Sequence, residues 1–198
     1  MVEAHRMDST LVATNPDGST DSWRSTDIDL GAIWYWDRDT VLQKSYDAWS
    51  RLGHPPMSSQ FAPALEGLFT GPGSDAAENP GACLFYAETG RTNPFDYRIV
   101  TPHNDRPSVR LRDVQPALLR TALMSDLNIC KYTFMPCYQQ IWRKVGGNAK
   151  DAVRLLLPTI DEAGDVHRIY GLSRPVANDA PDIDETTDGQ RRTHPDYV

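Results

Sequence analysis

The fold is decided by three consecutive segments of this 198-residue chain: Arg154-Leu-Leu-Leu-Pro-Thr-Ile160, Asp161-Glu-Ala-Gly-Asp165 and Val166-His-Arg-Ile-Tyr-Gly-Leu-Ser173. The outer two are rich in branched and aromatic residues, and the five residues between them include Gly164, which tolerates turn geometry. This pattern predicts an antiparallel hairpin that closes a domain. Because successive side chains of a strand point to opposite faces, Leu155 and Leu157 are expected to face the core and Arg154 to face solvent or a partner.

Upstream of this hairpin, the apolar period changes twice. Helical spacing predicts helices over 39–52, where Asp39 is a candidate cap and Gly53 a stop, over 60–69, and from Asp113 or Gln115 to Leu123. Strands are expected over 82–88, 95–100, 139–145, 151–160 and 166–173. The order is therefore two strands, a helical stretch and a three-strand meander. The aromatic segment 29–36 is too short to distinguish a strand from a docking segment.

Charge and composition separate the two ends from the body of the chain. Residues 1–24 hold four acids and two bases, residues 25–175 hold 17 and 16, and residues 176–198 hold six and two. Few apolar residues occur at the ends, which therefore cannot bury enough surface to offset the entropy of ordering. We expect mobile tails at 1–24 and 176–198 and one domain over 25–175, led by the helix at 39–52.

The same features limit the classes of function. A nearly neutral body lacks the positive field of nucleic-acid binding, although Arg106, Arg110 and Arg112 form a local basic group. No apolar run approaches the roughly 20 residues of a membrane span, and the first residues are too polar for a secretory signal. A cytoplasmic protein is expected. The three cysteines, Cys83, Cys130 and Cys137, lack disulfide or zinc spacing and predict reduced, mostly buried thiols.

Motifs of known chemistry are missing from the sequence. Gly71-Pro-Gly-Ser has neither the Lys-Ser/Thr of a phosphate-binding loop nor a third glycine, and no serine-hydrolase or zinc-protease motif occurs. Asp161, Glu162 and Asp165 lack the alternating spacing of a calcium loop, and a hairpin turn accounts for all three. Neither a metal site nor an identifiable cofactor is therefore predicted.

Three parts of the predicted domain resemble the PAS-like domains of small bacterial signalling proteins. Tyr46-Asp-Ala-Trp49, followed by Pro55-Pro56 and Phe61-Ala-Pro63, is similar to the Trp-containing helix and Phe-x-Pro segment of that family. Phe95-Asp-Tyr-Arg-Ile99 resembles its aromatic strand, and the stretch from Arg154 to Gly171 resembles its ending. The resemblance covers residues 39–174 and departs from the family between 101 and 135, where the glycine-rich turn of many members is not recognised.

This resemblance implies an α+β, PAS-like fold: a five-stranded antiparallel sheet covered on one face by helices, with an N-terminal helical extension. It implies a non-enzymatic sensory or regulatory module of bacterial signal transduction that binds a small ligand, a protein of a signalling pathway or a second copy of itself. Aromatic and leucine side chains on strands that would face the helices are the candidate ligand pocket or else plain core: Tyr97, Trp142, Leu155, Leu157 and Tyr170.

Two other functions fit the same sequence. A small α+β enzyme would hold an acid-base pair in a cavity, and Asp96 with His167 is the candidate pair. That hypothesis requires the two side chains to converge within hydrogen-bond reach. A purely structural interaction module would instead have a sheet packed solid on its covered face.

Overall fold

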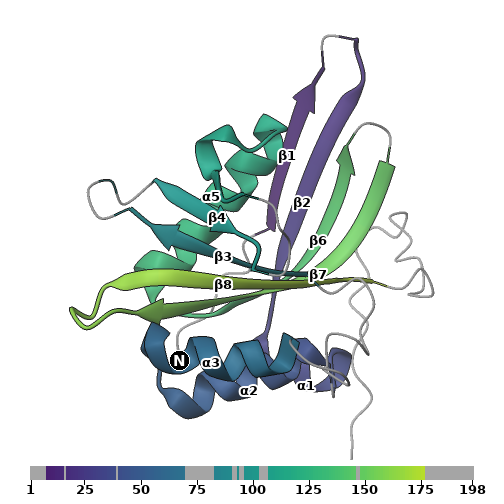
Figure 1. The fold of residues 1–198 in the computed structure, drawn as a ribbon. Helices are drawn as coiled ribbons and strands as arrows, with labels where there is room; N and C mark the ends of the chain where they lie inside the picture. Colours follow the sequence, from purple (N-terminus) through teal and green to yellow (C-terminus); the bar gives the residue numbers. More distant parts are fainter. Residues whose placement is uncertain are drawn as a thin grey trace, which may run out of the picture.

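An eight-stranded antiparallel sheet forms the centre of the computed structural model (Figure 1), with strand order β1-β2-β6-β7-β8-β3-β4-β5. The structure describes residues 8–15, 17–38, 40–69, 83–90, 93, 96–102, 107–145 and 148–176. The strands are β1 Asp8–Thr14, β2 Thr20–Ile28, β3 Cys83–Thr89, β4 Tyr97–Val100, β5 Val109–Arg110, β6 Cys137–Val145, β7 Asn148–Ile160 and β8 Val166–Pro175. The helices are η1 Leu30–Ala32, α1 Ile33–Trp36, α2 Val41–Leu52, α3 Ser58–Phe69, η2 Leu111–Asp113 and α5 Ala117–Thr133.

The predicted closing hairpin is confirmed as β7 and β8, whose register pairs Leu155 with Leu172 and Leu157 with Tyr170. Its turn is built from the acidic and glycine residues of the sequence pattern. The Asp161 carboxylate accepts from the amide of Ala163 at 2.9 Å, and Gly164 adopts a φ of 85°. A side chain at that φ would be strained, so the glycine defines where the two strands reverse.

The expected five-stranded sheet with helices on one face is wrong. Five strands match the predicted ones, as β3, β4, β6, β7 and β8, but β1, β2 and β5 extend the sheet to eight. Helices also cover both faces: Figure 1 shows α1–α3 on one side of the β7–β8 hairpin and α5 on the other. The central strands of this sheet carry apolar side chains on both faces, as Leu155 and Leu156 of β7 show, and helices bury each of the two faces.

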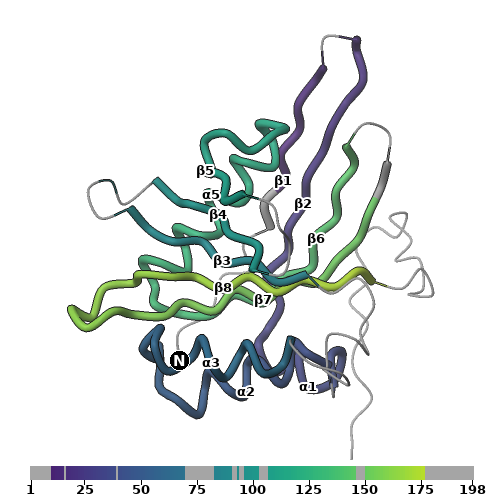
Figure 2. Tube along the Cα trace, in the orientation of Figure 1, coloured from purple at the N-terminus to yellow at the C-terminus, as the bar shows by residue number. Residues whose placement is uncertain are grey.

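Part of the N-terminal region 1–24, which was expected to be a tail, belongs to the sheet. β1 lies within the region expected to be a tail and pairs along its whole length with residues 20–26 of β2, and β2 pairs in turn with β6. The β1–β2 hairpin extends away from α1–α3 (Figure 2). Its anchor is Trp23, which is only 4 % exposed. Residues 1–7 lie outside the described residues, as do residues 177–198 of the acidic tail predicted over 176–198.

The two faces of the sheet hold separate cores. The first core lies between α1–α3 and the sheet, and the second core lies between α5 and the opposite face. The first contains Ile33, Val41, Leu42, Trp49, Phe61, Leu65, Tyr138, Val153, Leu155, Leu157, Tyr170 and Leu172. The second contains Ala87, Tyr97, Leu111, Leu123, Leu127, Cys130, Leu156, Val166 and Ile169. Leu155 and Leu157 therefore face helices as predicted, while Leu156 is equally buried on the other side.

The segment 29–36 proves to be helical, as η1 followed by α1. The Asp29 carboxylate accepts from the amide of Gly31 at 2.7 Å and so begins η1. The predicted helices at 39–52 and 60–69 are confirmed as α2 and α3, although the candidate cap Asp39 lies outside the described residues. No helix in the described part of the chain is long and apolar enough to cross a membrane.

Gly171 of β8 provides a test of packing between neighbouring strands. It pairs with Phe85 of β3, and a Cβ at position 171 would lie 2.1 Å from Phe85 Cζ. Because the ring covers the glycine, Gly171→Ala should lower the free energy of unfolding by about 1–3 kcal/mol, measured by urea melts.

The control is Gly67→Ala, at an exposed position of α3 with nothing within 4 Å of the added methyl group. It should raise stability by about 0.5–1 kcal/mol, because alanine is the better helix former. A Gly171→Ala protein as stable as the wild type would show that the Phe85 ring does not rest on the glycine backbone.

Candidate interaction surface

Three consecutive aromatic residues of α1 are exposed to solvent. Trp34 is 44 % exposed, Tyr35 is 85 % exposed and Trp36 is 57 % exposed, whereas Ile33 is completely buried in the first core. A single helical turn can direct only part of its circumference toward the sheet, so the residues after Ile33 point outward. Large aromatic side chains clustered on a surface are typical of an interaction site.

The aromatic turn is fixed to the sheet by the residue that follows it. Asp37 is completely buried, and its carboxylate accepts hydrogen bonds from the Tyr138 hydroxyl and from Nε of Arg174. Nη2 of Arg174 also donates to the Trp36 carbonyl at 3.2 Å. The Thr40 hydroxyl donates to the Asp37 carbonyl at 2.6 Å. These bonds join the end of α1 to β6 and β8 and so fix the position of the three exposed aromatic residues.

The negative charge of the buried Asp37 carboxylate is balanced by the Arg174 guanidinium. Burial raises the pKa of Tyr138, and the hydrogen bond to Asp37 and the Asp37 charge raise it further. Tyr138 therefore remains a neutral donor at physiological pH. The Asp37 carboxylate is paired with the Arg174 guanidinium, whose side chain is 23 % exposed. An ion pair with one fully buried member costs desolvation energy, which the extra hydrogen bonds from Tyr138 and to the Trp36 carbonyl help to offset.

Arg154 is a second buried charge, on the opposite face of the sheet. The expectation that it faces solvent or a partner is therefore wrong. This side chain is 4 % exposed and forms an ion pair with Asp126 of α5. Nη2 of Arg154 donates to Gln139 Oε1 at 2.7 Å, and Gln139 Nε2 donates to Asp27 at 2.9 Å. The guanidinium lies 5.7 Å from the centre of the Trp23 ring. Arg154 faces neither solvent nor an external partner because α5 and β2 cover it.

The predicted pocket residues do not share one site. Leu155, Leu157 and Tyr170 meet in the first core, where the rings of Phe61 and Tyr170 lie 5.1 Å apart. Tyr97 belongs to the second core, on the other face of the sheet. Trp142 is 38 % exposed and outside both cores. The structure thus brings together three of the five residues and surrounds them with protein side chains from α2 and α3.

The proposed acid-base pair is not brought together. Asp96 lines a polar surface pocket of about 210 Å³ whose other lining residues are Glu88, Thr89, Gly90, Arg98 and Arg110. His167 is not among them, and its backbone carbonyl accepts from Thr89 on the neighbouring strand. No hydrogen bond joins the Asp96 and His167 side chains, both of which the structure describes. The geometry required by the enzyme hypothesis is therefore missing.

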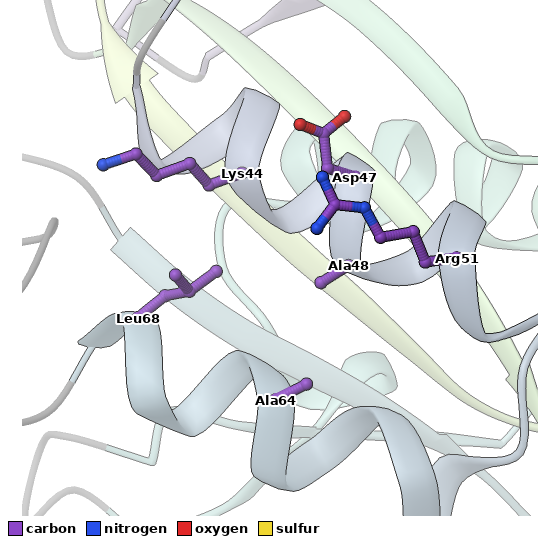
Figure 3. Close-up of a pocket in the computed structure, with 6 residues that line it drawn as sticks. All are labelled: Lys44, Asp47, Ala48, Arg51, Ala64 and Leu68. Atoms are coloured by element: carbon purple, nitrogen blue, oxygen red, sulfur yellow. The ribbon is translucent and has the colours of Figure 1, made fainter.

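A shallow groove of about 280 Å³ separates the outer parts of α2 and α3 (Figure 3). In this view Lys44, Asp47 and Arg51 extend from α2, and the apolar lining comes from Ala48 of α2 and from Ala64 and Leu68 of α3. Burial raises the pKa of Asp47, while the charge of Arg51 lowers it. Among the described residues, no group of three His, Cys, Asp or Glu side chains could hold a metal ion. The groove therefore presents side chains of both charges beside an apolar lining.

The residues predicted from the sequence to form a site did not include Asp37, Arg174 or Asp126. The position of Asp37 directly after the Ile-Trp-Tyr-Trp run was a local signal for this residue. Its partners, Tyr138 and Arg174, lie 101 and 137 residues away along the chain, so no local pattern reveals these bonds.

No family model, no curated protein and no solved structure matches this chain.

Proposed function

We propose that this protein is a non-enzymatic regulatory protein that acts by association of two copies through the aromatic surface of α1. The observation that supports this proposal is the exposure of Trp34, Tyr35 and Trp36 on a helical turn that the buried Asp37 fixes to the sheet. A regulatory role in bacterial signalling is what the resemblance over residues 39–174 implies. The close packing around Leu155, Leu157 and Tyr170 favours association over binding of a small ligand at that place.

A second copy is the partner that the surface chemistry favours. The aromatic surface is uncharged and therefore complements its own two-fold copy through ring-to-ring contact. Exposed charges of opposite sign flank it, with Asp29 before α1 and Arg38 after Asp37.

The available area predicts a weak dimer. Three partly exposed aromatic side chains offer on the order of 300–400 Å² in each copy, given the usual size of such side chains. Stable interfaces bury about 800 Å² per partner, and smaller ones are typical of transient complexes. Association should therefore depend on protein concentration and be missed in dilute samples.

Replacing all three aromatics, as Trp34→Gln, Tyr35→Gln and Trp36→Gln together, should abolish association with little loss of folding stability. Exposed substitutions usually change stability by less than about 0.5 kcal/mol each. Sedimentation velocity over a concentration series measures the result: the average mass of the wild type should rise with concentration, and the triple variant should remain monomeric.

Trp142→Gln is the matched control, since Trp142 is also an exposed tryptophan but lies on β6 outside α1. It should associate like the wild type. A wild type that stays monomeric at the highest concentration would refute the proposal, and so would a triple variant that dimerises normally.

A further inference from the structure

Two cysteines that are seven residues apart meet where α5 turns into β6. Sγ of Cys130 donates a hydrogen bond to Sγ of Cys137 across 3.2 Å. Cys130 is completely buried in the second core, and Cys137 is half-buried at the first position of β6. The sequence spacing did not suggest a pair, because the contact depends on how the chain reverses between the two elements.

The reversal is made by Phe134. This residue adopts a φ of 60°, the left-handed conformation that usually selects glycine, and its amide donates to the Cys130 carbonyl at 3.0 Å. The turn ends α5 and returns the chain so that Cys137 begins β6 beside the last helical turn. The backbone, rather than a mobile side chain, therefore brings the two sulfur atoms together.

We propose that Cys130 and Cys137 form a reversible disulfide bond, which makes this turn an oxidative modification site. A disulfide requires a sulfur separation of about 2.05 Å, so the sulfur atoms must approach by about 1.2 Å. Rotation of the two side chains can supply a movement of that size. Neither residue is needed for the association proposed through α1, so this inference does not depend on the proposed function.

The oxidant that we assign is a hydroperoxide, and the order of the steps follows from exposure. The Cys137 thiolate attacks one peroxide oxygen, which breaks the O–O bond and gives a sulfenic acid and hydroxide. The Cys130 sulfur then attacks the Cys137 sulfur, forms the S–S bond and releases water with its own proton. Overall, two thiols and one hydrogen peroxide give one disulfide and two waters.

Cys130 is suited to the second step rather than the first. Burial raises the pKa of its thiol, and the hydrogen bond to Cys137 and the charge of that residue raise it further. A buried thiol with a raised pKa reacts slowly with peroxide in solution, but it is held against the place where the Cys137 sulfenic acid forms. The disulfide would also restrict the backbone between the two cysteines, which includes the exposed residues Tyr132, Phe134 and Met135.

The test uses the full-length Cys83→Ser protein, because Cys83 is exposed and is the third of the three cysteines. After treatment with hydrogen peroxide, the protein is denatured with a thiol-blocking maleimide and its intact mass is measured. We expect loss of both maleimide-reactive thiols, a mass lower by two hydrogen atoms, and recovery of both thiols with dithiothreitol. The product should migrate as a monomer on a non-reducing gel.

Two further variants in the Cys83→Ser background separate the steps. With Cys130→Ser, the sulfenic acid on Cys137 should persist and be trapped by dimedone; with Cys137→Ser, Cys130 should remain a free thiol. Retention of both thiols after peroxide treatment of the parent protein would overturn the proposal. Oxygen addition to Cys137 without the disulfide, or a disulfide-linked dimer, would overturn it equally, and none of these measurements requires a known partner.

Discussion

Replacing Asp126 with alanine is expected to destabilise the protein by about 3–5 kcal/mol, because it leaves the Arg154 guanidinium buried without its counter-charge. Arg154 and Asp126 are 4 % and 3 % exposed, so water cannot readily take the place of the lost carboxylate. Gln139 keeps its bonds to Arg154 but cannot neutralise the charge. Urea melts should show a large fall in the transition midpoint.

Asp113→Ala is the matched control, since Asp113 pairs with Arg112 at 4.0 Å where both side chains are more than 60 % exposed. Exposed pairs contribute little, and this change should cost less than about 1 kcal/mol. Equal stabilities of the Asp126→Ala and Asp113→Ala proteins would show that solvent reaches Arg154.

A double variant separates the cost of an unpaired charge from the value of the pair. Asp126→Leu with Arg154→Met removes both charges, and apolar replacement of a buried pair is often close to neutral. Here part of the loss should remain, because the Gln139 Oε1 atom then loses its donor and an unsatisfied buried group costs about 1–3 kcal/mol. The double variant should nevertheless be more stable than Asp126→Ala alone.

Asp37→Ala should be the second most damaging substitution, with a loss of about 3 kcal/mol and a loosened α1. It leaves the buried Tyr138 hydroxyl without an acceptor, at about 1–3 kcal/mol, and removes the ion pair with Arg174. The cost is smaller than at Asp126 because Arg174 is 23 % exposed and can regain water. Urea melts measure the stability, and acrylamide quenching of tryptophan fluorescence reports on the α1 turn.

Asp37→Asn serves as its control, because the amide oxygen can still accept one hydrogen bond while the charge is lost. Its stability should lie between those of the wild type and Asp37→Ala. If Asp37→Ala left both stability and quenching unchanged, the aromatic turn would not depend on this anchor, and the rigid surface on which the proposed association rests would be lost.

The two hairpins at the ends of the described chain show how much of the fold could be predicted from the sequence. The β7–β8 hairpin follows from strong local signals: branched residues, the Asp161 turn and Gly164. The β1–β2 hairpin was missed because the inward positions of β2 on the α5 side are Asp21, Trp23 and Ser25, of which only the tryptophan is apolar. Buried polar residues conceal the alternation that marks a strand, and only their partners on other elements account for them.

The candidate interaction surface could be anticipated only in part. The aromatic residues of 29–36 are visible in the sequence, but their exposure is not, since aromatic side chains are usually buried. Trp49 and Trp36 illustrate this, because Trp49 is 1 % exposed and donates to the Pro158 carbonyl, whereas Trp36 is 57 % exposed. Their exposures differ because Trp49 lies on the face of α2 that packs against the sheet, whereas Trp36 of α1 points away from it.

The sequence by itself determined the local elements: the β7–β8 turn, the end of α2 at Gly53 and the order of the strands β3, β4, β6, β7 and β8. These depend on turn conformations and apolar periodicity, which act between residues that are close in the chain. Only the tertiary structure decided that both faces of β7 are covered, with Leu155 and Leu157 on one side and Leu156 beside Arg154 on the other. A charged residue is buried only where a partner such as Asp126 meets it, and that meeting depends on the packing of distant elements rather than on the residues beside it.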